Sequence, residues 1–263
     1  MKELLLRTLT GILLIILIAG SILLGPISFL SILLVIFILA IRELGSLFHL
    51  KPVQQWVVGT PGLLSIFLVF AIVHFQWNPM LLLFPVALWT IVAFQPKLIQ
   101  TGSLATLWVG IPLSCFLALG WIGENKDYES LIPLSVISLI WINDTFAYVT
   151  GSLMGKHKMT PKLSPGKSWE GFSGGILFTL VFAWVLYSIT GVYNLITWFT
   201  FALFISLLAL LGDLFESGLK RKKAVKNSGE ILPGHGGILD RFDSLFFVAP
   251  GILVLLIVLK LIQ

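Results

Sequence analysis

The sequence predicts an all-α, polytopic integral membrane protein of about nine transmembrane helices, with its N-terminus in the cytoplasm. Of its 263 residues, 57% are hydrophobic and only 11% are charged, and the mean hydropathy is +1.02. An average soluble domain carries about 25% charged residues. A water-soluble fold of this size could not bury so much apolar surface, so the bilayer must be the solvent for most of the chain.

Apolar segments long enough to cross a bilayer recur along the whole chain, since a spanning helix takes about 20 residues. We expect nine spans, at residues 8–24, 27–41, 57–74, 80–95, 103–123, 131–153, 171–192, 196–215 and 245–262. The first span follows two basic residues, as a signal peptide would. It lacks a clear small-residue cleavage site and leads directly into the second span, so we expect an uncleaved helix.

The distribution of basic residues supports this count. With nine spans, 15 of the 17 Lys and Arg residues lie on the side of the N-terminus, and only Lys126 and Lys260 lie on the other. Cytoplasmic loops carry an excess of Lys and Arg. We therefore expect basic loops that all face the cytoplasm, and no nucleic-acid partner. The lack of organelle targeting favours a bacterial inner (plasma) membrane.

The chain divides into spans 1–5, over residues 1–123, and a C-terminal region over residues 124–263 that carries the chemistry. Two loops in this region, residues 155–170 and 216–244, hold 10 of the 17 basic residues. Other loops are short and nearly uncharged, so any chemistry must occur at the membrane surface or inside it. The single cysteine, Cys115, excludes an internal disulfide and a cysteine-based zinc site.

One acidic residue, Asp144, lies well inside the sixth predicted span. An ionisable group at that depth is a candidate functional residue, although it could also be a hydrogen-bond partner between helices. Tyr148, Gly151 and Gly155 follow it at helical spacing and share its face. The pairs Gly151/Gly155 and Gly171/Gly175 match the small-residue pattern of packed helices.

Three more aspartates lie where the last two spans meet the second basic loop. Asp213 ends the eighth span, with Glu216, Ser217 and Lys220 on the same helical face, and Asp240 and Asp243 follow a glycine-rich turn. Carboxylates bind Mg²⁺, and Lys and Arg bind phosphate. Backbone N–H groups of the turn and a helix N-terminus can also hold an anion.

This pattern predicts a site for a metal-bound polyphosphate. The alternative is that the basic runs only bind anionic lipid headgroups and the aspartates neutralise them. A Walker A motif is absent, because Gly166-Lys167-Ser168 lacks the required glycine at position 161, which is proline.

The stretch from Ser217 to Asp243, SGLKRKKAVKNSGEILPGHGGILDRFD, resembles the signature of the phosphatidate cytidylyltransferase (CDP-diacylglycerol synthase) family. Upstream, WINDTFAYVTGSLMGKHK and SPGKSWEGFSGG also resemble this family, so the similarity covers about residues 141–243. Two positions depart from its pattern. Asn227 replaces an aspartate, and Gly166 replaces a lysine.

The resemblance implies that CTP and phosphatidate react to give CDP-diacylglycerol and pyrophosphate, for phospholipid synthesis in a lipid membrane. It also implies a requirement for Mg²⁺, a potassium ion beside it, and a homodimer. Carried over to this chain, the expected magnesium ligands are Asp213 and Asp240. The expected catalytic residues are Asp213, Asp240, Asp243, Lys220, Arg221, Arg241 and His235. The expected substrate-binding residues are Asp144, Tyr148, Lys156, Ser164, Lys167, Trp169, Glu170, Ser217, Lys226, Gly236 and Gly237.

Other functions stay open at the level of sequence. The nearest are a cytidylyltransferase for another lipid phosphate and a CTP-dependent lipid kinase. An ion-coupled transporter is a different class, but transporters usually show paired repeats and broken helices near the bilayer midplane. Here no repeat is evident, and the polar residues gather on one side. A lipid-binding scaffold would leave the glycine-rich acidic segment unexplained.

Overall fold

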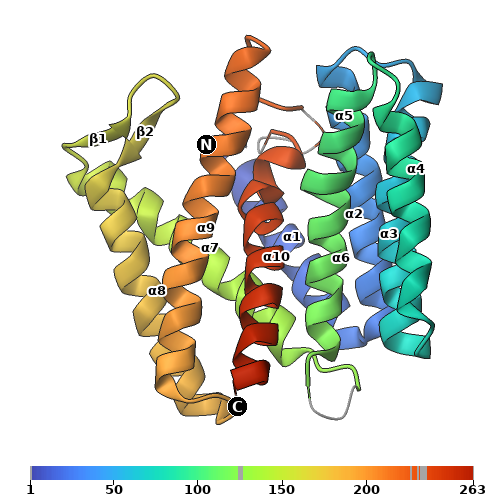
Figure 1. Ribbon diagram of the computed structural model, residues 1–263. Helices are drawn as coiled ribbons and strands as arrows, with labels where there is room; N and C mark the ends of the chain where they lie inside the picture. Colours follow the sequence, from blue (N-terminus) through green and yellow to red (C-terminus); the bar gives the residue numbers. More distant parts are fainter. Residues whose placement is uncertain (1, 124–126, 226, 230, 232–235, 263) are drawn as a thin grey trace. The chain divides into compact units, whose positions relative to one another are not determined.

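The computed structural model describes residues 2–123, 127–225, 227–229, 231 and 236–262 (Figure 1). The chain forms two compact units. Unit 1 comprises residues 1–133 and 225–242, and unit 2 comprises residues 134–224 and 243–263. Each unit is described by itself below.

Unit 1 is built from apolar helices. Its first three are α1 (Lys2–Leu24), α2 (Pro26–Leu47) and α3 (Pro52–Phe75), and a single-turn 3-10 segment (Pro79–Leu82) leads into α4 (Leu83–Ala93). The next helical rod runs without a break through α5 (Ile99–Ser103), a π-helical segment (Leu104–Gly110), α6 (Ile111–Ala118) and a 3-10 turn (Leu119–Trp121).

Unit 2 contains the long helices of the C-terminal half and one small hairpin. The helices are α7 (Leu131–Met154), α8 (Trp169–Thr190), α9 (Leu195–Lys222) and α10 (Leu239–Ile262); the first residues of α7 and of α10 belong to unit 1. Between α7 and α8, strands β1 (Lys158–Thr160) and β2 (Ser164–Ser168) pair antiparallel, with Lys158 opposite Ser168.

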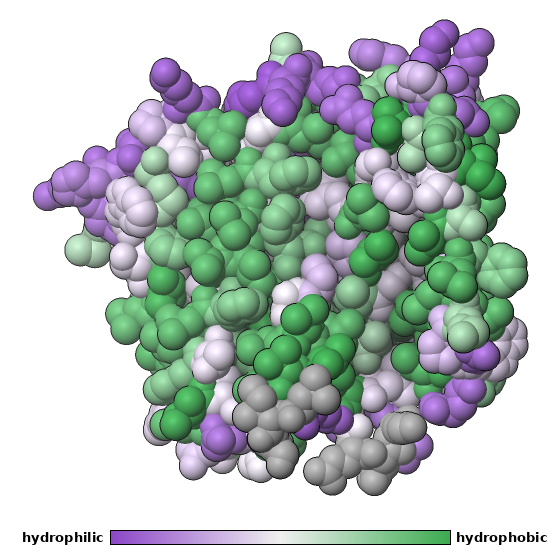
Figure 2. All heavy atoms as spheres, viewed as in Figure 1, coloured by the Kyte–Doolittle hydropathy of each residue, from purple (hydrophilic) through white to green (hydrophobic). Residues whose placement is uncertain are grey.

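The predicted all-α polytopic membrane fold is confirmed. Among the described residues, seven helices are long and apolar enough to cross a membrane, and two shorter apolar helices cover Leu9–Leu24 and Pro79–Ala93. Each of the nine predicted spans overlaps one of these segments. Figure 2 shows apolar residues over the outer faces of α8 and α9 and hydrophilic residues at the hairpin. The count of nine spans and the cytoplasmic N-terminus stay predictions.

Close backbone contacts and buried polar pairs hold unit 1 together. An added Cβ on Gly110 would lie 2.5 Å from the Cα of Gly62, so α3 and the π-helical segment touch through two glycines. Beside this contact, the hydroxyls of Ser65 and Ser114 lie 3.1 Å apart. Tyr128 donates to the carbonyl of Ile22 at 2.6 Å; burial raises the pKa of its phenol, which keeps the donor proton in place.

In unit 2, α7 and α8 pack through the glycines of the two small-residue motifs. A Cβ added to Gly171 would lie 2.7 Å from the carbonyl oxygen of Ala147. A Cβ added to Gly175 would lie 3.0 Å from the carbonyl oxygen of Asn143. A Cβ added to Gly151 would lie 3.4 Å from the Cα of Gly171. The predicted packing role of these motifs is therefore confirmed, and it fixes α8 and the hairpin before it against α7.

Replacing Gly171 with alanine should destabilise the protein by about 1 to 3 kcal/mol, because backbone atoms of α7 occupy the place of the new methyl group. The check is the thermal unfolding midpoint of the purified protein in detergent. Gly20→Ala in α1 is the matched control, since a Cβ there meets nothing within 4 Å. Equal midpoints for the two variants would contradict the close helix contact.

Candidate functional site

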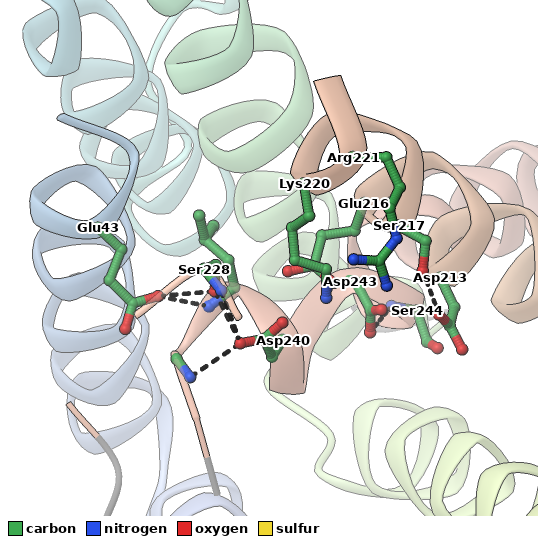
Figure 3. Close-up of polar contacts among 12 residues, drawn as sticks. Glu43, Asp213, Glu216, Ser217, Lys220, Arg221, Ser228, Asp240, Asp243 and Ser244 are labelled. Carbon is green, nitrogen blue, oxygen red and sulfur yellow. Dashed lines mark hydrogen bonds and ion pairs between the residues drawn. The ribbon is translucent and has the colours of Figure 1, made fainter. Parts of the chain in front are cut away.

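Four carboxylates come together in unit 2, and we call them the acid cluster: Asp144 from α7, Asp213 and Glu216 from α9, and Asp243 from α10. Asp243 lies close enough to the other three for their charges to interact, and Asp144 interacts in the same way with Asp213. Asp243 and Glu216 are buried. Three of the four carboxylates are labelled in Figure 3. Three helices that are distant in sequence thus supply one negatively charged centre.

The acid cluster depends on α9 continuing past its apolar part. The predicted span ends at residue 215, but the helix runs to Lys222, so Asp213, Glu216, Ser217 and Lys220 share one helical face. Lys220 Nζ lies 2.7 Å from Glu216 Oε2, and the Ser217 hydroxyl donates to Asp213 Oδ1 at 3.4 Å. The helix therefore fixes both acids and their partners in one rigid element.

The hairpin adds basic groups to the acid cluster. Lys167 on β2 places its Nζ 2.6 Å from Asp213 Oδ2. About two turns further along α9, the Arg221 side chain donates through Nε to the carbonyl of Leu163 at 3.3 Å. These two contacts hold the hairpin against α9, and they bring part of the predicted loop 155–170 to the aspartate of the eighth span.

Hydrogen bonds orient the two remaining acids. The backbone N–H of Ser244 donates to Asp243 Oδ1 at 2.8 Å, and the Ser244 hydroxyl lies 3.5 Å from Asp144 Oδ2. The Asn143 amide donates to Asp144 Oδ1 at 3.2 Å. Close packing of α9 on α10 also matters, since a Cβ on Gly212 would lie 2.4 Å from the Asp243 carbonyl oxygen.

Lysines pair with two members of the acid cluster. Lys167 contacts Asp213 and Lys220 contacts Glu216, at 2.6 and 2.7 Å. Among the described residues, no three His, Cys, Asp or Glu side chains are grouped so as to hold a metal ion. Mg²⁺ typically takes one or two carboxylates and completes its shell with water and phosphate oxygens. The carboxylate oxygens of the acid cluster are donors of the kind that such an ion takes.

The other predicted residues of the first loop have local roles. Glu170 accepts backbone N–H bonds from Lys156 and His157, and its Oε1 lies 2.5 Å from His157 Nδ1. Ser168 caps α8 by accepting from Gly171 N at 3.1 Å. Trp169 is exposed, as is Tyr148 on α7. The structure thus gives Glu170 a role in folding the loop, and the substrate-binding roles of these residues stay predictions.

A second polar centre lies in unit 1, and sequence reasoning missed its main residue, Glu43 of α2. This side chain is buried, with 3% exposure, and it accepts from Ile238 N at 2.8 Å and from Leu239 N at 3.0 Å. Asp240 Oδ2 accepts from Gly237 N at 2.9 Å and from both the N–H and the hydroxyl of Ser228 at 3.0 Å (Figure 3). An acid within an apolar helix was the available signal.

This second centre bears on one interpretation of the sequence, which stays a prediction. The glycine-rich turn and the start of α10 were expected to offer N–H groups to a substrate anion. In the structure the N–H groups of residues 237–239 donate to carboxylates of the chain itself. Asp240 Oδ2 therefore already has donors from Gly237 and Ser228 of the chain itself.

The remaining predicted residues are placed as follows. Gly236 has a φ of +84°, and Arg241 is exposed. Ser164 begins β2. Lys226 and His235 lie outside the described residues, so their predicted roles stay predictions.

Comparison with known proteins agrees with the resemblance in the motifs. The family model described as "Cytidylyltransferase family" matches residues 5–259. Proteins named phosphatidate cytidylyltransferase match over a shorter stretch. That of Staphylococcus saprophyticus is 41% identical over 152 residues, and those of Staphylococcus epidermidis and Staphylococcus aureus are each 42% identical, over 151 and 153 residues.

Each of these three matches covers 54% of this chain and 58% of the relative, so less than two thirds of the relatives' length is spanned. The family model, in contrast, covers nearly all of this sequence. The chain belongs to the cytidylyltransferase family.

Proposed function

We propose that this protein is a phosphatidate cytidylyltransferase, which transfers the cytidylyl group of CTP to phosphatidate to give CDP-diacylglycerol and pyrophosphate. The acid cluster, with Lys167 of β2 and Lys220 of α9 beside it, is the observation that carries the proposal. Such a centre suits a substrate pair made of a polyphosphate and a membrane lipid. The names of the staphylococcal relatives support the same reaction.

The reaction requires no nucleophile from the protein. A phosphate oxygen of phosphatidate attacks the α-phosphorus of CTP, and the bond from that phosphorus to the bridging oxygen breaks as pyrophosphate leaves. The residues of the chain would orient the two substrates and offset their charge. Lys220, Arg221 and Arg241 would contact CTP phosphates or the lipid phosphate. Lys167, which pairs with Asp213 in unit 2, would add a further positive charge for these phosphates.

Magnesium is part of the proposal. Bound Mg²⁺ would supply positive charge that stabilises phosphate oxygens as negative charge develops. The proposed ligands are Asp213 and Asp240, with Asp243, which shares unit 2 with Asp213, assisting. A potassium ion beside the magnesium, a homodimer, and a site that faces the cytoplasm at the inner membrane are further parts of the proposal.

The test is an assay of the full chain, purified in detergent, with labelled CTP and defined lipids. We expect label to enter CDP-diacylglycerol when phosphatidate and Mg²⁺ are present, and not when EDTA is added. A panel of other lipid phosphates tests the acceptor, and faster labelling of one of them would replace phosphatidate in the proposal. No labelling of any acceptor would refute the function, and ion flux in liposomes without CTP would favour a transporter.

A further inference from the structure

Glu43 is a buried acid in an apolar helix, and its interactions account for its presence there. Within α2, only Arg42 and Glu43 are charged. An ionisable side chain in such a helix is costly unless it is paired or hydrogen-bonded. Both carboxylate oxygens of Glu43 have backbone donors: Ile238 N reaches Oε1 at 2.8 Å, and Leu239 N reaches Oε2 at 3.0 Å. The Ser228 hydroxyl lies 3.4 Å from Oε2 and closer, at 3.0 Å, to Asp240 Oδ2.

The donors belong to the start of α10 and to the segment before it. The first N–H groups of a helix have no partner within the helix, and its N-terminus carries partial positive charge. Glu43 supplies both the acceptor and the negative charge for α10, from a position 195 residues earlier in the chain. The contact is tight, because a Cβ on Gly229 or on Gly237 would lie 2.6 or 2.5 Å from this carboxylate.

The network continues from Glu43 to Asp240. Ser228 lies within hydrogen-bond distance of both acids, and its backbone N–H also donates to Asp240 Oδ2 at 3.0 Å. Glu43 therefore holds the two residues that precede Asp240 in the chain and also the serine that orients its side chain (Figure 3). Outer partners of this kind set the geometry of a site residue.

We propose that Glu43 is a positioning residue for cytidylyl transfer: its carboxylate fixes the N-terminus of α10 and the Ser228 segment, and so sets the orientation of Asp240. The inference rests on the proposed function. Glu43 itself touches neither substrate. In Glu43→Gln the side chain keeps one acceptor oxygen, but its amide nitrogen cannot accept, so either Ile238 N or Leu239 N loses its partner.

The test compares wild type, Glu43→Gln, Glu43→Asp and the control Glu129→Gln, which makes the same chemical change at an exposed position of unit 1. Hydrogen exchange of peptides that cover residues 236–240 reports the anchoring without reference to activity. For Glu43→Gln we expect exchange at least about tenfold faster in these peptides only. We also expect kcat to fall on the order of 100-fold, with KM for CTP within about twofold of wild type.

Normal exchange in Glu43→Gln would overturn the inference, and so would faster exchange with an unchanged kcat, which would make Glu43 merely structural. If Glu43→Gln fails to fold, the Glu43→Asp variant provides the test, because it keeps the carboxylate charge. A folded Glu43→Asp protein with wild-type kcat overturns the proposal, and a folded protein with a lowered kcat supports the proposal. An inactive wild type would instead refute the proposed function, while an active wild type beside a normal Glu43→Gln refutes only the role of Glu43.

Discussion

Replacing Asp213 with asparagine should lower the rate of cytidylyl transfer by about 100- to 1,000-fold. The change keeps the shape of the side chain and removes one negative charge from the acid cluster, at the residue that contacts both Lys167 and Ser217. Because Asp213 is a proposed magnesium ligand, the Asp213→Asn variant should also need more Mg²⁺ to reach its half-maximal rate. The measurement is the initial rate of labelled CDP-diacylglycerol formation at saturating CTP, over a range of Mg²⁺ concentrations.

Two further variants make this result interpretable. Asp127→Asn changes an exposed aspartate in unit 1 and should leave the rate within about twofold, because surface charges so placed contribute little. Lys167→Met removes only the partner of Asp213. If Asp213 served merely to hold Lys167, both site variants would lose the same activity with the same Mg²⁺ dependence. If the Asp213→Asn enzyme kept about a third of the wild-type rate, Asp213 would not be a magnesium ligand in the reaction.

The apolar helices could be predicted because each one is a local property of the sequence. A run of about 20 apolar residues can satisfy its backbone in lipid only as a helix, whatever its neighbours are. The ends of the helices were less predictable. The hydropathy pattern predicts an end to the span near residue 215, where charged residues begin. The helical spacing of these charged residues continues, and α9 runs to Lys222. The structure ends this helix where Lys223 and Ala224 turn away, and Ala224 has a φ of +55°.

The hairpin and the Glu43 network were missed for a different reason. β1 and β2 are short, and the Pro, Gly and Lys residues of β2 show no alternation of apolar and polar side chains. The role of Glu43 depends on N–H groups that lie 195 residues later in the chain, so the local sequence could not predict it. The aspartates of the second loop, by comparison, could be identified in advance because glycines and basic residues surround them in the sequence.

Replacing Lys220 with methionine should destabilise the protein by about 3 to 5 kcal/mol, the usual effect of removing one partner of a buried ion pair. The side chains of Lys220 and Glu216 are only 12% and 2% exposed, with 2.7 Å between Nζ and Oε2. Without the lysine, the buried Glu216 side chain would lie beside Asp243 without its partner at 2.7 Å. Unfolding in mixed detergent micelles measures the free-energy change.

Lys222→Met is the matched control, because Lys222 is exposed on the last turn of the same helix and should change stability by less than about 1 kcal/mol. The double variant Lys220→Met/Glu216→Leu should recover most of the lost stability, since it removes the stranded charge along with its partner. That recovered protein should still be nearly inactive, because the proposed reaction uses the charge of Lys220 and the pair itself is dispensable for folding. Equal losses for Lys220→Met and Lys222→Met would show that Glu216 is stabilised without its lysine.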